Sequence, residues 1–282
     1  MSLSDRAMLV KLTVSMWTAG KIDKIVTRET NAQHRADESA GSYRKKLAPK
    51  EALSGVTTAK SRLTSYHKKM TATWGDDGTG ILPAEIYMEY IQEMKELIEK
   101  FELAADDFAV SKYPEMLRRE ENRLGTMHNS DDYPPVTDIR KRFGVDLKIF
   151  SVPDTKDFRV SIGEDELAEI RADIEKRSGE AQNHMLKDLF GRLLKVVKHA
   201  AERLSSDESN FQKSMIENIS KLTAIMPTFN LTGDPDLARI TKEVGDKLCD
   251  YTAAELRDDD DLRSEKALIA KELVETIEKY VA

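Results

Sequence analysis

The sequence predicts an α+β fold that is predominantly α-helical, with long antiparallel helices packed with a small antiparallel sheet of about three strands. Long stretches show apolar residues at helical spacing, and short runs alternate between apolar and polar residues. Charged residues make up 34% of the 282 residues and aromatic residues 6%, a balance that is typical of long solvated helices.

The central predicted helix runs from Pro83 to about Leu124. Its apolar stripe follows alternating steps of three and four over three heptads, as in a coiled coil. Further apolar residues widen the stripe, so we expect this helix to pack on more than one neighbour. Pro114 predicts a bend near Tyr113. The stripe consists of Tyr87, Tyr90, Met94, Leu97, Phe101, Ala104 and Phe108.

The predicted strands have period-two alternation with β-branched residues. The first is Leu9–Trp17. Two further runs, 145–149 and 158–162, flank a turn-rich loop and predict a hairpin. Such a sheet needs a helix over its apolar face.

The remaining chain is divided by turn and capping signals. We expect residues 27–48 to form a loop or a weak helix, and residues 75–80 to break the structure. We also expect two parts, 1–163 and 164–282, packed as one unit. Helical spacing predicts helices over 49–74, 165–204, 205–227, 234–251 and 262–280.

The cysteine content and the lack of long apolar segments indicate the cellular compartment. The single cysteine, Cys249, rules out an intramolecular disulfide and fits a reducing compartment. The first residues lack the continuous apolar core of a signal peptide, and no apolar window is long enough to span a membrane. We therefore expect no membrane partner and a cytoplasmic location, in a bacterial host cell if the protein is encoded by a phage.

Motifs for catalysis are missing from the sequence. Gly78-Thr79-Gly80 is not followed by the Gly-Lys-Ser/Thr of a phosphate-binding loop. The five histidines lack zinc-site spacing, and no serine lies in a Gly-x-Ser-x-Gly motif. We therefore predict no catalytic, cofactor-binding or metal-binding residues, and a protein that is not an enzyme.

The charge is distributed unevenly along the chain. Residues 1–74 hold 14 Lys and Arg against 6 Asp and Glu, whereas the remaining 208 residues hold 30 against 45. A basic region is a candidate for binding polyanions, although a charge run is also typical of a solvated face. The candidate nucleic-acid-binding residues are Arg44, Lys45, Lys46, Lys60, Arg62, Lys68, Lys69, Lys187, Arg192, Lys195 and Arg203.

Aromatic side chains in the basic region could stack on unpaired bases. They are Trp17, Tyr43, Tyr66 and Trp74. Tyr66 and Trp74 also fall on an apolar helical stripe, which predicts a place in the core instead.

Three segments carry a resemblance to a known family. Residues Leu9–Lys21, the helix after Leu82-Pro83 and the segment Arg142–Pro153 resemble a phage and proteobacterial domain-of-unknown-function family. That family begins with a strand ending in Ser-x-Trp-x-Gly-Arg/Lys and has a helical arm and an Arg-Phe-led strand. The resemblance covers roughly the first 160 residues. Because the family is often encoded beside MoxR-type AAA ATPases, it implies an adaptor or assembly partner, and it supplies no catalytic residues.

Two classes of function therefore remain open. The first is a non-enzymatic phage-type protein, oligomeric, that binds nucleic acid and favours single-stranded DNA, with the acidic C-terminal third limiting binding. The second is a helical adaptor of a MoxR-type AAA ATPase, or a virion or assembly component. In the second, helix 84–110 would mediate self-association or bind a partner protein.

Overall fold

The computed structural model describes residues 3–154, 164–206 and 213–281, so the strand expected at 158–162 lies outside the described residues. The fold is predominantly helical with a small antiparallel sheet, which confirms the predicted fold class. Contacts group the chain into two units. The first unit comprises residues 1–11, 68–88 and 148–282, and the second comprises 12–67 and 89–147. This grouping does not follow the expected boundary after residue 163.

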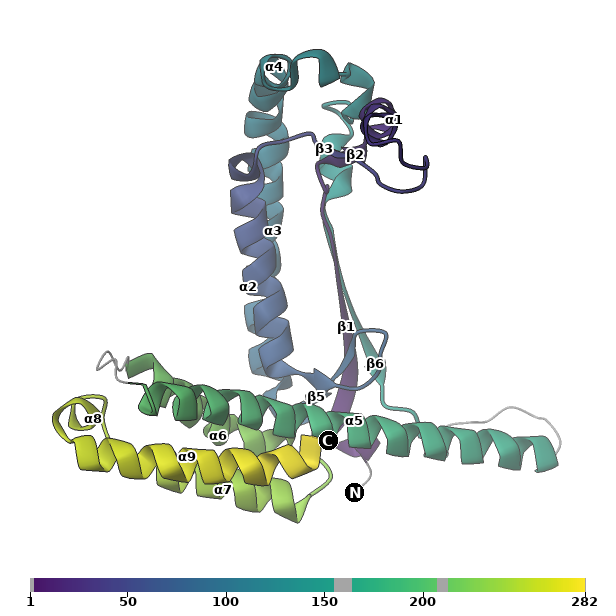
Figure 1. Cartoon of the computed structure of the whole chain (residues 1–282). Coiled ribbons are helices and arrows are strands. Elements are labelled where there is room, and N and C mark those ends of the chain that lie inside the picture. The colour runs from purple at the N-terminus through teal and green to yellow at the C-terminus, as the bar shows by residue number, and fades with distance from the viewer. Residues whose placement is uncertain (1–2, 155–163, 207–212, 282) are drawn as a thin grey trace. The chain divides into compact units, whose positions relative to one another are not determined.

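The first unit is a helical bundle (Figure 1). Helix α5 packs closely along α9, and Phe190 of α5 stacks on Tyr280 of α9 with ring centroids 4.6 Å apart. Helix α7 begins where the Asp234 carboxylate accepts a hydrogen bond from the Leu237 amide at 2.7 Å, with Pro235 in the first turn. The helices are α5 Glu164–Leu204, α6 Lys213–Phe229, α7 Pro235–Leu248, the short α8 Glu255–Asp258 and α9 Asp260–Val281.

The core of the first unit joins the bundle to one end of the sheet. The predicted stripe of α5 is buried from Ala181 to Leu204. It shares a cluster with Leu9 and Ile81 of the sheet, so helices cover an apolar face of the sheet as expected. Arg6 also donates a hydrogen bond to the Leu231 carbonyl at 2.8 Å.

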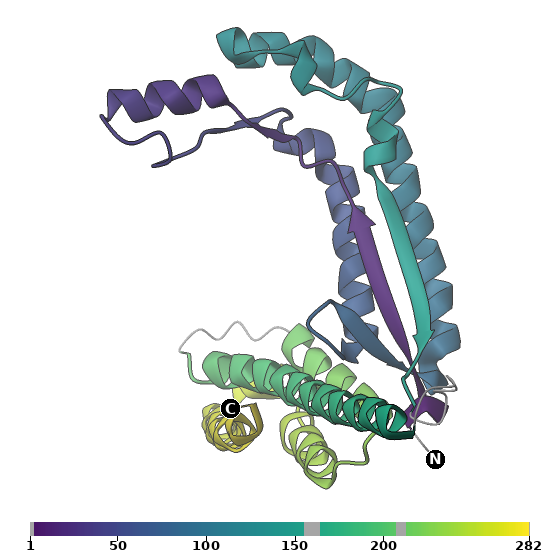
Figure 2. The same cartoon turned by 90° about the vertical axis from the view of Figure 1, so that its right-hand side faces the viewer.

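Within the described residues the sheet has four strands in the order β4-β5-β1-β6, one more than expected. Strand β1 pairs antiparallel with β5 from Ala7 opposite Pro83 to Lys11 opposite Thr79. On its other side β1 lies beside β6, with the two arrows pointing in opposite directions (Figure 2). The strands are β1 Ala7–Ser15, β4 Ala72–Thr73, β5 Thr79–Pro83 and β6 Gly144–Ser151.

Strands β4 and β5 flank the segment that we expected only to break the chain, and β4 takes the place of the last turn of the helix expected over 49–74. Residues 75–78 form the turn of a β4–β5 hairpin, in which Gly78 has a φ of +80° that favours glycine. The Asp77 carboxylate accepts a hydrogen bond from the Thr79 amide at 3.1 Å and forms an ion pair with Lys11 at 2.7 Å. The alternation of apolar and polar residues did not predict these two short strands, because they contain too few residues to show it.

The second unit contains the predicted central helix and most of helix α2. Its stripe from Tyr90 to Phe108 is buried, and Tyr90 forms a buried hydrogen bond with His67 Nδ1 at 2.8 Å. The expected bend is present as a π-helical turn, Phe108–Lys112, directly before Pro114. Proline lacks an N–H and crowds the preceding turn, which explains the change of pitch. The helices are α2 Ser54–Met70, α3 Tyr87–Asp107 and α4 Tyr113–Leu124.

The polar segment that we expected to be a loop or a weak helix contains both. Asp23 caps helix α1, Lys24–Gln33, by accepting hydrogen bonds from the next turn's amides. The buried Asn31 amide donates to the Glu38 and Gly41 carbonyls at 3.0 and 3.2 Å and so holds the loop that follows. Strands β2, Gly20–Ile22, and β3, Arg44–Lys46, pair antiparallel on either side of this segment. Short 3-10 turns occupy Leu3–Asp5, Lys50–Leu53, Ala84–Ile86, Gly125–Met127, Ser130–Asp132 and Ile139–Arg142.

Candidate nucleic-acid interface

Strand β3 divides its three basic side chains between two environments. Arg44 and Lys46 are exposed, whereas Lys45 between them is only 3% exposed. Successive side chains of a strand point to opposite faces, so one run of bases supplies both a surface and a buried group.

Lys45 belongs to a buried ionic cluster. Its ammonium group lies 2.6 Å from Asp132 and 3.3 Å from Asp23, and it donates a hydrogen bond to the Met127 carbonyl at 2.6 Å. Burial disfavours the charged form, but the bonds to Asp132 and Asp23 outweigh it and raise the pKa of Lys45. Because these partners satisfy its ammonium group, we leave Lys45 out of the candidate surface.

Several of the other basic side chains lie around a hollow in the second unit. It has a volume of about 570 Å³ and no carboxylate among its lining residues. Lys60 reaches it from α2, and Lys141 and Arg142 reach it from the turn before β6. Ser15 and Thr18 add hydroxyl groups. Three basic groups at a surface whose lining contains no acid create a positive potential, so this site favours an anion. We call it the basic hollow; it is lined by Val14, Ser15, Met16, Trp17, Thr18, Lys60, Lys141 and Arg142.

Arg44 lies beside the basic hollow. Its guanidinium donates a hydrogen bond to Thr18 Oγ1 at 3.3 Å. A Cβ atom at Gly20 would lie 2.5 Å from Arg44 Nε, so only glycine leaves room for this side chain position. Strand β3 therefore places a fourth cation next to the other three, in the space that Gly20 of β2 leaves.

The turn that carries Lys141 and Arg142 is fixed by its neighbours. Ile139 is buried in the second unit's core, and Arg140 forms ion pairs with Glu102 and Asp106. Lys141 pairs with Asp138 at 2.6 Å. In the described part of the chain Arg142 has no ion-pair partner, and neither has Lys60, so both can offer their charge to a ligand.

Lys141 and Arg142 were not predicted as site residues from the sequence. They follow Arg140 in a run of three basic residues, and this run is the signal that could have identified them. Of this run, the family resemblance placed only Arg142, at the head of a strand. The structure instead bends the run into a turn, and this turn directs two of its side chains to the hollow.

Two other candidate residues of the second unit lie apart from the hollow. Arg62 lines a separate depression of about 360 Å³ with Thr58 and Lys100. Lys46 is exposed on β3, where its carbonyl accepts a hydrogen bond from Arg123 at 2.6 Å.

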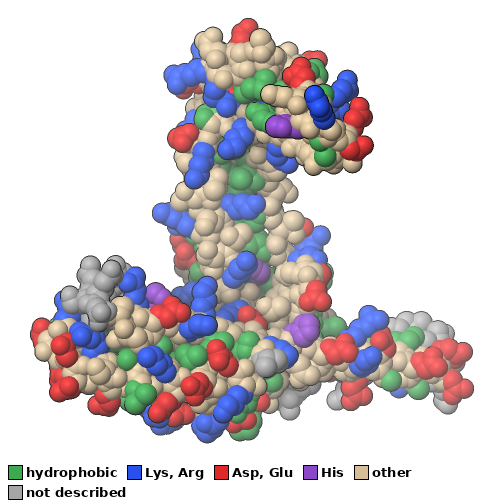
Figure 3. Space-filling model, viewed as in Figure 1, with side chains coloured by type: hydrophobic (Ala, Val, Ile, Leu, Met, Phe, Trp, Pro, Cys, Tyr) green, Lys and Arg blue, Asp and Glu red, His purple; other side chains and the backbone are tan. Residues whose placement is uncertain are grey.

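The first unit carries a second basic surface, on α5. Its blue side chains are visible along this helix in Figure 3. Arg192 is half-buried and donates hydrogen bonds to the Lys69 and Thr71 carbonyls while pairing with Asp188 at 2.8 Å. These contacts bring the last turn of α2 beside α5. We call this surface the α5 ridge; its exposed candidate residues are Lys68, Lys69, Lys187, Lys195 and Arg203.

The aromatic residues of the basic region also differ in exposure: some are buried in the core and one is exposed. Trp17 is buried edge-to-face against Tyr113, with centroids 5.4 Å apart, and Tyr66 stacks on Tyr90. Trp74 is half-buried against the first unit's core. Tyr43, directly before Arg44, is exposed. Tyr43 is therefore the aromatic residue of this set that is best placed to stack on a base.

Among the described residues, no three or more His, Cys, Asp or Glu side chains are grouped so as to hold a metal ion. In the same residues no helix is both long enough and apolar enough to cross a membrane. Comparison with protein families, curated proteins and solved structures finds no match to this chain.

Proposed function

We propose that this protein binds single-stranded nucleic acid through the basic hollow and acts by binding rather than by catalysis. The observation that carries the proposal is the convergence of Arg44, Lys60, Lys141 and Arg142 around a concave surface whose lining has no acid. Phosphate groups are the natural partners of such a surface, because Lys and Arg neutralise them and release bound counterions.

Two further features favour a single strand. The hydroxyl groups of Ser15 and Thr18 can donate hydrogen bonds to phosphate oxygens, which positions a backbone without reading its sequence. Exposed Tyr43 lies next to Arg44 in the chain, and an aromatic ring can stack on an unpaired base. The α5 ridge is a second exposed basic surface, on the first unit.

The test is fluorescence anisotropy of a labelled oligo-dT, titrated with the full chain at low and moderate salt. We expect binding that weakens as salt rises. Replacing Lys60 and Arg142 together by Glu should weaken binding at least about tenfold, or about 1.4 kcal/mol. The plot of log affinity against log salt should become less steep, by about 0.7 for each phosphate that the variant no longer neutralises.

Arg62→Glu is the matched control. It makes the same change of charge as Lys60→Glu alone, half that of the double variant, two residues from Lys60 on the same helix but in a different depression. We expect it to leave affinity nearly unchanged. No binding at low salt would overturn the proposal, and equal weakening by Arg62→Glu would assign binding to the general charge rather than to the hollow. A duplex that binds as tightly as oligo-dT would remove the preference for single strands.

A second candidate function is a helical adaptor, and the outer face of α3 favours it. Leu103 is 61% exposed, and Val110, seven residues later in the π-helical turn, is 76% exposed. Residues seven apart lie on the same side of a helix, so these two offer an apolar contact to a partner. The heptad stripe itself is buried in the protein, so a partner of helix 84–110 would use this opposite face.

The adaptor candidate is tested by retention of a co-expressed MoxR-type AAA ATPase, the partner class that the family resemblance implies. Replacing Leu103 and Val110 by Lys should abolish retention, because charges would then oppose an apolar contact. Exposed Lys95→Ala on the same helix is the control. Retention that survives the double replacement would exclude this face.

A further inference from the structure

The paired strands β2 and β3 have two faces with different surroundings. Residues directly opposite each other in an antiparallel pair point to the same face. Lys21 lies opposite Lys45, and both form ion pairs with Asp132, so this face is turned towards the buried ionic cluster. We call the other face the outer face of β2–β3; it consists of Gly20 opposite Lys46 and of Ile22 opposite Arg44.

On the outer face, the guanidinium of Arg44 is held along one edge. A Cβ atom at position 20 would lie 2.5 Å from Nε, 3.0 Å from Nη2 and 3.1 Å from Cζ of Arg44. Both nitrogens of that edge are closer to this position than the carbon between them, so the group turns its edge towards Gly20. Nη2 of the same edge donates to Thr18 Oγ1 at 3.3 Å. These contacts occupy an edge of the guanidinium and leave its planar faces for a ligand.

The surroundings of this guanidinium favour an aromatic ligand that belongs to a polyanion. Arg44 is exposed, and in the described part of the chain it has no ion-pair partner. Ile22, directly opposite, is 54% exposed and adds an apolar side chain next to it. The Asp23 amide donates to the Tyr43 carbonyl at 2.9 Å, so the strand pairing continues past Ile22 and fixes its position.

We propose that the outer face of β2–β3 is a platform for one unpaired base, which stacks on the plane of the Arg44 guanidinium with Ile22 beside it. The inference rests on the proposed function, because the cations of the basic hollow hold the phosphates on either side of that base. Guanidinium planes stack on bases, and every base offers a flat π face, so the platform accepts any sequence. Thr18 lines the hollow and accepts the hydrogen bond from Arg44, so the platform adjoins the phosphate site.

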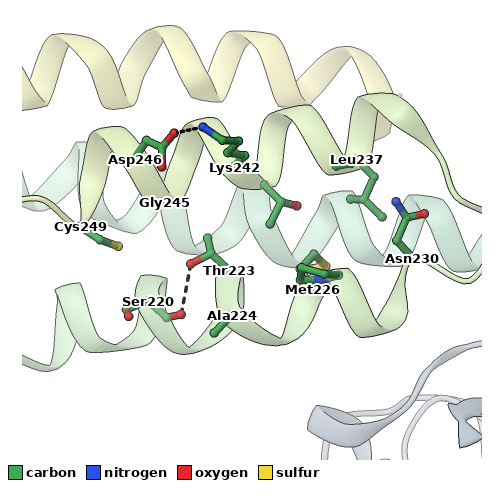
Figure 4. Close-up of a pocket in the computed structure, with 13 residues that line it drawn as sticks. Ser220, Thr223, Ala224, Met226, Asn230, Leu237, Lys242, Gly245, Asp246 and Cys249 are labelled. Atoms are coloured by element: carbon green, nitrogen blue, oxygen red, sulfur yellow. Dashed lines mark hydrogen bonds and ion pairs between the residues drawn. The ribbon is translucent and has the colours of Figure 1, made fainter. Parts of the chain in front are cut away.

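An open apolar surface by itself does not favour nucleic acid. The groove between α6 and α7 in the first unit has a volume of about 590 Å³, and the charged residues of its lining are Lys242 and Asp246. They form an ion pair at 2.6 Å, drawn in Figure 4, so the groove offers no net charge to a phosphate. The outer face of β2–β3 differs because both of its charged residues, Arg44 and Lys46, are basic.

The test compares two labelled oligonucleotides by fluorescence anisotropy with the full chain. One is oligo-dT, and the other is an abasic strand with the same number of phosphates. We expect the wild type to bind oligo-dT about tenfold more tightly, because only oligo-dT has bases to stack. Both affinities should fall as salt rises, but their ratio should stay the same, because stacking releases no counterions.

Two variants remove the platform and keep every charge. Gly20→Ala places a Cβ atom 2.5 Å from Nε and displaces the guanidinium, which is at the end of a flexible side chain. Arg44→Lys keeps the charge but has no plane. We expect each variant to bind the abasic strand within about twofold of the wild type and to lose at least about threefold of the preference for oligo-dT.

The matched controls are Gly144→Ala, where an added Cβ meets nothing within 4 Å, and Arg28→Lys on an exposed arginine of α1. Both should keep the wild-type ratio, and unfolding curves check that every variant is folded.

The outcomes separate the two proposals. If neither strand binds, the proposed function fails and the platform fails with it. If the wild type binds both strands equally, the platform is overturned while phosphate binding stands. If both platform variants keep the full preference for oligo-dT, the base stacks elsewhere, with Tyr43 as the first alternative, and the platform is again overturned.

Discussion

The basic hollow and the α5 ridge are both rich in Lys and Arg, but the cations of the hollow are available to a ligand, whereas a cation beside the ridge holds two helices together. In the hollow, Lys60 and Arg142 lie at a concave surface and have no ion-pair partner in the described chain. Beside the ridge, the guanidinium of half-buried Arg192 joins the end of α2 to α5 through backbone carbonyls and Asp188. The density of charge along a sequence therefore does not say which charges are available to a ligand; their partners do.

Adjacent residues show the same contrast within the second unit. Arg44 lies beside the hollow, whereas Lys45 is enclosed with Asp23 and Asp132. Measurements of stability can test this distinction between structural and available cations.

The largest effect is expected from Lys45→Met. This change removes the cation that Asp23 and Asp132 share and leaves Asp132 with Lys21 alone, and breaking a buried ion pair by removing one partner typically costs about 3–5 kcal/mol. We expect the free energy of unfolding, measured in urea, to fall by that amount. Lys46→Met on the exposed side of β3 is the control and should change it by less than about 0.5 kcal/mol. If the Lys45→Met variant is stable but no longer binds the oligonucleotide, Lys45 contacts the ligand and is not a structural cation.

Arg192→Ala should have an intermediate effect. It removes the donor of the Thr71 and Lys69 carbonyl bonds and the partner of Asp188, so we expect the free energy of unfolding to fall by about 1–3 kcal/mol. Lys195→Ala, three residues along the same helix, should stay within about 0.5 kcal/mol. Denaturant midpoints compare the two variants, and equal midpoints would mean that Arg192 is no more structural than its exposed neighbour.

The smallest effect concerns the exposed pair of Asp77 and Lys11. The hydrogen bond from Lys11 is the main cause that lowers the pKa of Asp77 from 3.8 to about 2. A lowered carboxyl pKa adds stability above the ordinary value, and this stability is lost as the pH falls from about 4 to about 2. Because the pair is exposed, we expect only a few tenths of a kcal/mol.

Asp77→Asn should remove this part of the acid dependence, as shown by urea midpoints measured at several pH values in that window. An acid dependence that is the same in the variant and the wild type would assign it to other carboxyl groups. Asp132, whose pKa is lowered by Lys21 and Lys45 despite burial, is the first of these.

Helical periodicity predicted the long elements well because their stripes are the core faces. The stripe from Tyr90 to Phe108 and that from Ala181 to Leu204 are both buried. Strands β4 and β5 were missed because a hairpin of two and five residues gives periodicity little to act on. The long strand β1 was found close to its observed bounds, Ala7–Ser15.

The candidate site could be predicted only in part. Arg44 and Lys60 were identified from charge, but Lys141 and Arg142 join them through a fold that brings residue 60 near residue 141. Such proximity depends on tertiary contacts, which a local pattern does not contain. The burial of Lys45 was equally hidden, because its partners Asp23 and Asp132 are far from it in the chain.

Through Asn31, the position of the loop before Tyr43 can change without any change in the residues that line the basic hollow. Its amide bonds to the Glu38 and Gly41 carbonyls tie down the loop that leads to Tyr43 and Arg44. Any alteration at position 31 that removes this clip would release that loop and change how the aromatic ring is presented, while Lys60, Lys141 and Arg142 keep their supports. Under the function that we propose, ligand preference and ligand affinity would therefore vary separately among variants of this sequence.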